Sequence, residues 1–163
     1  MSSVLSLDPG IEMGYAYWPN SHWKYKKAPQ EADCIIPCTS VTWQRRFEDL
    51  MGTFQTMLRK WQPTFVVVEE PMFFGAGSEA SAAAGSLIKL AAVYGGLMAV
   101  AATQERYSFQ IVSITVAKWK GQLPKPVVQN RLKEIYQDQW NPRWSSHAVD
   151  AIGIGTYYMG LFE

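Results

Sequence analysis

The chain alternates between short apolar runs, typical of strands, and longer stretches in which apolar residues recur every three or four positions, typical of amphipathic helices. We predict strands over residues 4–7, 14–18, 22–27, 64–68 and 109–114. The fourth is continuous in β-branched and aromatic residues, as expected for a strand buried on both faces. We predict helices over residues 40–61, 78–104, 127–136 and 145–158, with Ser40 as the first N-cap and a loop within residues 28–37. Strands that come first and then alternate with helices predict a mixed α/β sheet.

Composition limits what this fold contains and binds. The 163 residues, 48% hydrophobic and 18% charged, fit one domain over residues 1–163 without repeats or linkers. A net charge of +1 argues against a uniformly basic surface, so any contact with nucleic acid depends on a local basic patch. Cys34 and Cys38 lack the second pair that a tetrahedral zinc site needs. No leader and no run of about 20 apolar residues is evident, so we expect a soluble intracellular protein without membrane contact.

Acidic residues stand where two predicted strands end. Asp8 closes the first strand directly before a Pro-Gly turn, and Glu69 and Glu70 close the fourth. His147 and Asp150 lie three residues apart near the start of the last helix, and that spacing places both side chains on one face. Carboxylates and an imidazole from distant parts of the chain can therefore meet. Oxygen-rich sites suit Mg²⁺ or Mn²⁺, and two such ions about 3.5–4 Å apart commonly serve phosphodiester hydrolysis.

Each of these residues also has an ordinary structural interpretation. Asp8 could simply be a turn residue, the two glutamates a solvated strand end, and His147 a polar residue at a helix start. Asp150 precedes an apolar helical segment and should face the core, where a carboxylate needs a cationic partner or a metal. Because successive strand residues point to opposite faces, only one of Glu69 and Glu70 can face Asp8 in a regular strand.

Three motifs carry a family resemblance: Val4–Gly10 with Gly14–Ala16, then Phe65–Glu69, then His147–Ala151. In this order and at similar separations, they resemble the motifs of the RuvC-type Holliday junction resolvases of the RNase H-like superfamily. The resemblance covers nearly the whole chain and implies an RNase H-like fold, with a central mixed five-stranded sheet flanked by helices. Glu70 stands where the family usually has other residue types.

The resemblance also implies an activity and its cofactor. The family's enzymes are crossover junction endodeoxyribonucleases of DNA recombination and repair, which cut four-way junctions by paired symmetric nicks. Two Mg²⁺ ions per site, for which Mn²⁺ substitutes, would be held by the residues that match the family's catalytic positions: Asp8, Glu69, His147 and Asp150.

The family further implies a symmetric homodimer, whose twofold axis matches the two equivalent strands of a junction. Its interface involves the helix after the catalytic glutamate, here residues 78–104. The small residues of this segment suit equally well a helix that packs on its own sheet, so both interpretations stay open.

Basic and apolar residues near these motifs are candidates for DNA contact. A local positive patch suited to phosphates is formed by Lys118, Lys120, Lys125 and Arg131. The family has basic residues here too, although a solvated loop explains any single lysine. Met72 and Phe73 precede a Gly-rich stretch and are candidates for insertion between bases at the junction centre. The family has a Phe in this region, which favours Phe73.

Other functions remain in competition with junction resolution. A nuclease of the same fold could act on other branched DNA or on structured RNA, and a non-catalytic protein could bind junctions. A nucleotide-binding ATPase would need further phosphate loops and a longer, two-lobed chain, neither of which is found. We expect the protein to be cytoplasmic, in a bacterial cell or encoded by a phage.

Overall fold

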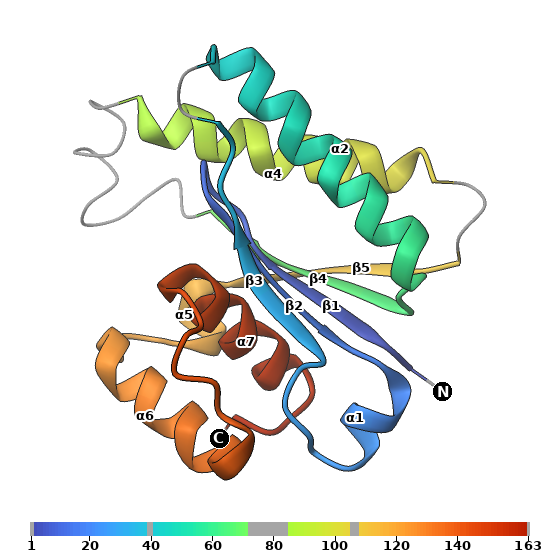
Figure 1. Ribbon diagram of the computed structural model, residues 1–163. Coiled ribbons are helices and arrows are strands. Elements are labelled where there is room, and N and C mark those ends of the chain that lie inside the picture. Colours follow the sequence, from blue (N-terminus) through green and yellow to red (C-terminus); the bar gives the residue numbers. More distant parts are fainter. Residues whose placement is uncertain (1, 39–40, 72–84, 105–107, 163) are drawn as a thin grey trace.

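A computed structural model describes residues 2–38, 41–71, 85–104 and 108–162. Its centre is a mixed sheet in the order β3-β2-β1-β4-β5 (Figure 1). The strands are β1 (Val4–Asp8), β2 (Met13–Trp18), β3 (Glu31–Ile35), β4 (Phe65–Glu70) and β5 (Gln110–Thr115). β1, β2 and β3 are antiparallel neighbours, whereas β4 runs parallel to both β1 and β5. The five-stranded mixed α/β sheet that we predicted is therefore confirmed.

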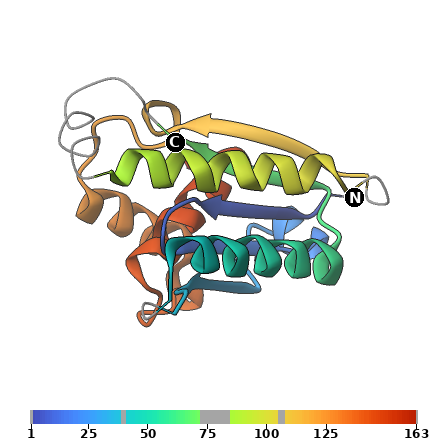
Figure 2. The same cartoon turned by 90° about the horizontal axis from the view of Figure 1, so that it is seen from above.

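Helices cover both faces of the sheet (Figure 1). One face carries α2 (Trp43–Trp61) and α4 (Ser86–Ala102), which lie side by side over the strands when seen from above (Figure 2). The other face carries the remaining helices: α1 (Asn20–Lys24), α5 (Val116–Trp119), α6 (Lys125–Tyr136), the short 3₁₀ helix η1 (Gln137–Gln139) and α7 (Ser146–Tyr158). Within the described residues, no helix has the length and apolar character needed to cross a membrane.

Alternation along the strands divides the core into two layers. In β4, Val66 and Val68 pack with α2 and α4, while Val67 packs with α7. In β1, Leu7 belongs to the α2 layer, and Ser6 Oγ donates a hydrogen bond of 2.7 Å to the Ala151 carbonyl of α7. Because side chains two positions apart share a face, the next residues on the α7 side are Asp8 in β1 and Glu69 in β4. The register places them side by side, since the residues just before them, Leu7 and Val68, are partners.

Helix α7 lies directly against the sheet because glycines remove the side chains that would hold it away. A Cβ atom on Gly14 of β2 would lie 2.1 Å from the carbonyl oxygen of His147. A Cβ atom on Gly155 of α7 would lie 2.4 Å from the Trp18 ring. Two backbones therefore touch at the start of α7, and this contact sets the height of His147 above the sheet.

The segment after β2 differs from the prediction. Residues 22–27 do not form a strand; α1 spans Asn20–Lys24, and the third strand is Glu31–Ile35, within the predicted loop. The aromatic residues that suggested alternation pack instead at the helix, where Trp23 lies edge-on to Phe65 with ring centroids 6.0 Å apart. Strand β3 lies at the edge of the sheet and needs hydrogen bonds on one side only, so the prolines near it are tolerated. The composition of the segment did not reveal this.

Helix boundaries also differ from prediction at two places, and a third lies outside the described residues. The N-cap of α2 is Thr42, whose hydroxyl accepts a hydrogen bond of 3.4 Å from the Arg45 amide, and Ser40 lies outside the described residues. Helix α6 begins at Lys125, two residues early, because Pro126 is tolerated in a first turn, where its missing N–H has no intrahelical partner. Residues 78–84 of the predicted α4 segment lie outside the described residues. The strand over 109–114 and the helix over 145–158 are confirmed within one residue.

Candidate active site

Four side chains converge where β1, β4 and α7 meet. Asp8 and Glu69 come from adjacent parallel strands, and α7 brings His147 and Asp150 from the face of the sheet opposite to α2 and α4. His147 Nδ1 donates to Asp8 Oδ2 at 3.2 Å. The structure thus brings together the residues that the sequence motifs singled out. Glu70 lies on the opposite face of β4, away from this cluster, because it follows Glu69 directly in a regular strand.

Burial and mutual repulsion perturb the titration of this cluster. Burial is the main reason why the pKa of Glu69 is raised to about 7, and the carboxylates of Asp8 and Asp150 raise it further. Burial likewise raises the pKa of Asp8, although its hydrogen bond with His147 acts in the opposite direction. The same hydrogen bond raises the pKa of His147. These shifts indicate carboxylates that are buried first and close to one another second, a combination that is common at functional sites.

Lys125 is the cation in closest contact with the carboxylates. Its Nζ atom lies 2.5 Å from Asp150 Oδ2, and its side chain is 45% exposed, whereas that of Asp150 is only 13% exposed. The second oxygen, Asp150 Oδ1, is buried and has no hydrogen-bond partner among the described residues. The sequence predicted that Asp150 would need a partner or a metal, and Lys125 meets that need at one oxygen only.

The donor set fits a divalent cation, although the side chains are not arranged as finished ligands. Among the described residues, no group of three or more His, Cys, Asp and Glu side chains has the geometry of a metal site. Two of the carboxylates instead contact groups within the protein, Asp150 the ammonium of Lys125 and Asp8 the imidazole of His147. Asp150 Oδ1 is buried without a partner, and the Glu69 carboxylate is buried beside two other carboxylates, so a cation would stabilise both groups. Oxygen donors with one imidazole suit Mg²⁺ or Mn²⁺.

The predicted DNA-contacting residues divide into three groups. Lys120 and Lys125 lie close enough to act on the carboxylates, since Lys120 lowers the pKa of Glu69 and Lys125 lowers that of Asp8. Lys118 is exposed on α5. Arg131 lines a separate cavity of about 630 Å³ on α6, next to Lys26 and Glu134.

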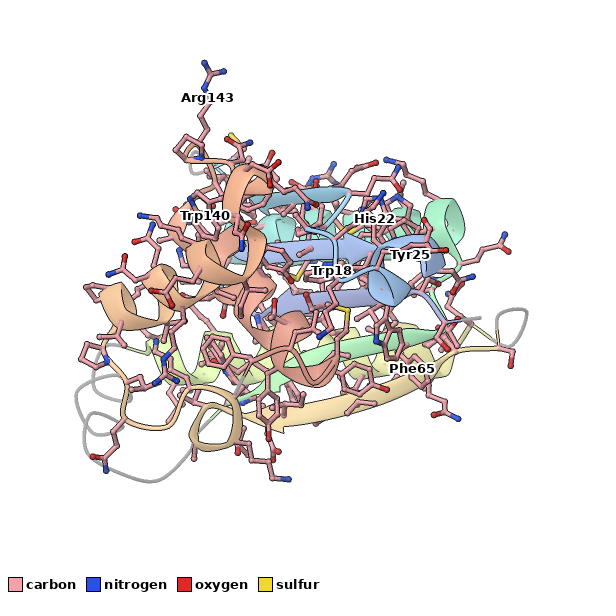
Figure 3. All side chains as sticks on the ribbon, turned by 90° about the horizontal axis from the view of Figure 1, so that it is seen from below. Trp18, His22, Tyr25, Phe65, Trp140 and Arg143 are labelled. Atoms are coloured by element: carbon pink, nitrogen blue, oxygen red, sulfur yellow. The ribbon has the colours of Figure 1, made fainter. Side chains whose placement is uncertain are left out.

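Met72 and Phe73 lie outside the described residues. The structure also displays a basic residue that the sequence did not single out. Arg143 is exposed, and it projects away from the body of the protein between η1 and α7 (Figure 3).

Two contacts at the site were missed from the sequence. Glu12 follows the turn after Asp8, and its Oε2 lies 3.6 Å from His147 Nε2, so this imidazole stands between two carboxylates. Trp119 donates its indole N–H to Glu69 Oε2 at 2.7 Å. One signal for Trp119 was present, since it is a single large aromatic residue between Lys118 and Lys120 in a segment that was otherwise assigned to the solvent.

A larger cavity lies elsewhere and is not this site. It has a volume of about 1020 Å³ and opens at the other ends of β1 and β4, where its walls include Ser3, Tyr17, Trp61 and Thr64. The carboxylate cluster instead lies at the ends of β1 and β4 that point away from this cavity. Function at these strand ends depends on the exposed surface around them.

Comparisons with known proteins bear on the fold. No family model and no curated protein matches the chain. Among solved structures, Thermus thermophilus RuvC in complex with a Holliday junction substrate is similar over 100% of this chain and 99% of its own, with 20% identity and a TM-score of 0.73. A second structure of T. thermophilus RuvC covers 98% and 97%, with 19% identity and a TM-score of 0.67.

A eukaryotic structure has the same architecture. The yeast mitochondrial Holliday junction resolvase Ydc2 is similar over 96% of this chain and 77% of its own, with 14% identity and a TM-score of 0.64. The resemblance drawn from three short motifs predicted this architecture. The chain has the fold of the RuvC-type Holliday junction resolvases.

Proposed function

We propose that the protein is a metal-dependent endonuclease that resolves four-way DNA junctions by paired symmetric nicks. One observation carries the proposal: Asp8, Glu69, His147 and Asp150 converge at the ends of two neighbouring strands as largely buried groups, and Asp150 Oδ1 has no hydrogen-bond partner among the described residues. They do so on a fold shared with a RuvC that was solved with a Holliday junction substrate. A fold alone does not define an activity, so the charge and geometry of this cluster are what favour catalysis.

The side chains of the site would have different roles in hydrolysis. Asp8, Glu69 and Asp150 would hold two Mg²⁺ ions through their oxygens, with His147 as a further ligand. Bound ions of this kind activate the attacking water and stabilise the charge on the leaving oxygen. Lys125, released from Asp150, would bind a phosphate oxygen of the cut strand. An exposed ammonium on a flexible stem can make this change, and Lys125 is 45% exposed.

The DNA would lie over α5 and the start of α6. Lys118, Lys120 and Lys125 present positive charge there, and Arg131 extends it along α6. A protein with a net charge of +1 binds DNA through such a local patch, and its affinity should fall steeply with salt. Met72 and Phe73 stay candidates for the apolar wedge.

We further propose a homodimer that is formed through α4. This helix packs on its own sheet through one face, which buries Val93, Leu97 and Ala101. Its opposite face is also apolar and is exposed: Ile88 is 74% exposed, and a Cβ atom added to Gly95 would have no neighbour within 4 Å. A helix that is apolar on both sides is typical of burial on both sides. A second copy would supply the missing layer and match the symmetry of a junction.

The test compares wild type with Asp8→Asn on a four-way junction, a flap, a linear duplex and a structured RNA, with Mg²⁺ and with chelator. Glu70→Gln is the matched control, since it removes a neighbouring carboxylate from the other face of β4. We expect symmetric nicks in the junction from wild type and Glu70→Gln, and a loss of at least about 10²-fold in Asp8→Asn.

Each other outcome contradicts part of the proposal. Equal cleavage of the linear duplex would exclude structure selectivity, and preferential cleavage of flaps or RNA would indicate another nuclease of this fold. Junction binding without any cleavage would indicate a non-catalytic binding protein. The cytoplasmic location in a bacterial or phage-infected cell stays a prediction from the sequence.

A further inference from the structure

Trp119 makes a single polar contact with the candidate site. Its indole N–H donates to Glu69 Oε2 at 2.7 Å, and the residue is only 2% exposed. No other hydrogen bond to the Glu69 carboxylate is seen among the described residues. The contact joins a buried neutral donor to a carboxylate whose pKa is raised to about 7, mainly by burial.

The sequence places Trp119 there through a short path. In the parallel register of β4 and β5, Glu69 is the partner of Ile114. Strand β5 ends one residue later at Thr115, and α5 begins at once with Val116. A helix of one turn reverses the chain just beyond the strand edge, and its last residue, Trp119, returns over Glu69.

The indole ring is held on the side away from Glu69. A Cβ atom on Gly153 of α7 would lie 2.5 Å from Trp119 Cζ3, so only glycine leaves room for the ring. Phe162 contacts the ring edge-on, with centroids 6.5 Å apart. Gly153 lies three residues after Asp150, on the same side of α7. The helix that carries one carboxylate therefore also fixes the donor that orients another.

The type of donor matters for a cation site. An indole N–H donates one hydrogen bond, accepts none and carries no charge. It can therefore fix the direction of a carboxylate without neutralising it, whereas the ammonium of Lys125 on Asp150 does both. A carboxylate that is oriented but still uncompensated is prepared for a metal ion, because little positive charge has to be displaced when the ion arrives.

We propose that Trp119 is a positioning residue for Glu69, whose N–H holds Oε2 and directs Oε1 toward the cation site beside Asp8. The inference rests on the proposed function, since it takes Glu69 as a ligand. It assigns Trp119 a role in cation affinity and rate, with no part in DNA binding. Outer-shell partners of this kind typically contribute a factor of about 10–100 to metal affinity or activity.

The experiment replaces Trp119 by Phe, which keeps an aromatic ring and removes the N–H. The matched control is Trp140→Phe, since the Trp140 N–H is buried and has no hydrogen-bond partner among the described residues (Figure 3). Mn²⁺ affinity is measured by electron paramagnetic resonance, without DNA. We expect about 10–100-fold weaker Mn²⁺ binding in Trp119→Phe and an unchanged affinity in Trp140→Phe. On a junction with Mg²⁺, kcat should fall while KM for DNA stays constant.

A second substitution separates positioning from packing. Site-specific incorporation of benzothienylalanine at position 119 preserves the shape of the indole and replaces its N–H by sulfur. The protein with benzothienylalanine should have the melting temperature of the wild type, and its Mn²⁺ affinity should be as weak as that of Trp119→Phe. If this protein binds Mn²⁺ and cuts like the wild type, the ring acts only by packing and the proposal is wrong.

The readouts also distinguish failure of this inference from failure of the proposed function. A wild type that binds Mn²⁺ but cuts no junction, with weaker binding in the position 119 variants, supports the role of Trp119 and contradicts junction resolution. If the wild type cuts junctions and the position 119 variants bind Mn²⁺ and cut as well as it does, the result supports junction resolution and contradicts the role of Trp119. A wild type that binds no Mn²⁺ overturns both.

Discussion

Gly14 is the position at which a single methyl group should disturb the site most. In the sheet it lies between Asp8 of β1 and Cys34 of β3, so its own backbone is held by neighbours on both sides. Its missing side chain faces the backbone at the start of α7. In Gly14→Ala, the strand cannot retreat, and the start of α7 with His147 has to move instead.

The structure gives the size of this movement. A Cβ atom at Gly14 would lie 2.4 Å from the carbonyl carbon of His147, whereas carbon atoms in contact stay about 3.5 Å apart, which leaves a deficit of about 1.1 Å. Overpacking against well-packed neighbours costs about 1–3 kcal/mol, and backbone against backbone belongs at the upper end. A displacement of about 1 Å in a catalytic group costs roughly 10²-fold in rate.

The assay measures both effects on the same protein. Chemical denaturation should give a free energy of unfolding about 3 kcal/mol below that of wild type. Junction cleavage under conditions where the variant is fully folded should be about 10²-fold slower. Gly52→Ala is the control, because a Cβ atom at this position in α2 has no neighbour within 4 Å. Wild-type stability and rate in Gly14→Ala would refute the backbone contact between β2 and α7, and lower stability with a full rate would refute its role in placing His147.

Three further substitutions or conditions test other parts of the reasoning. In chelator, the free energy of unfolding should fall by up to about 3 kcal/mol as pH rises from about 5 to 8. The cause is that the pKa of Glu69 is raised to about 7 in the folded state, which therefore binds the proton more tightly than the unfolded state. Thermal melts across this pH range measure the loss, and most of it should be absent in Glu69→Gln. Lys125→Met should destabilise the metal-free protein by about 1 kcal/mol, since it leaves Asp150 unpaired, and Mg²⁺ should raise the melting temperature of this variant more than that of wild type. Equal rises in melting temperature would contradict competition between the ammonium and the ion. Ile88→Glu should yield monomers in analytical ultracentrifugation with a stability within about 0.5 kcal/mol of wild type, and a dimer of unchanged affinity would contradict an interface on α4.

Much of the site followed from the sequence because it depends on local rules. Strand parity and the three-residue spacing in α7 follow such rules, and the parallel pairing of β1 with β4, which the structure adds, brings Asp8, Glu69 and Asp150 together. Parity also separates Glu69 from Glu70, a choice that the residue types left open. Parity and helical spacing can be read from short segments and do not require knowledge of distant contacts.

The features that the sequence did not reveal depend on tertiary contacts. Helix α1 replaced a predicted strand because Trp23 packs on Phe65, a residue more than forty positions away. The role of Trp119 requires both the register of β5 and the vacancy left by Gly153 on α7. Neither contact leaves a periodic pattern, so each side chain resembled an ordinary aromatic residue until the elements were assembled.

The three carboxylates are compensated unequally, and this inequality decides where a cation enters. Asp150 has the ammonium of Lys125 and Asp8 has the imidazole of His147, whereas the hydrogen bond to Glu69 comes from a neutral indole. Burial raises the pKa of Glu69 to about 7, so this carboxyl group keeps its proton up to that pH, and the hydrogen bond from the neutral indole offsets the shift only in part. A metal ion has to displace that proton, so its affinity should rise with pH up to about 7 and then level off. If position 119 carried a lysine, Glu69 would be ionised at a lower pH but already paired, and the ion would gain less.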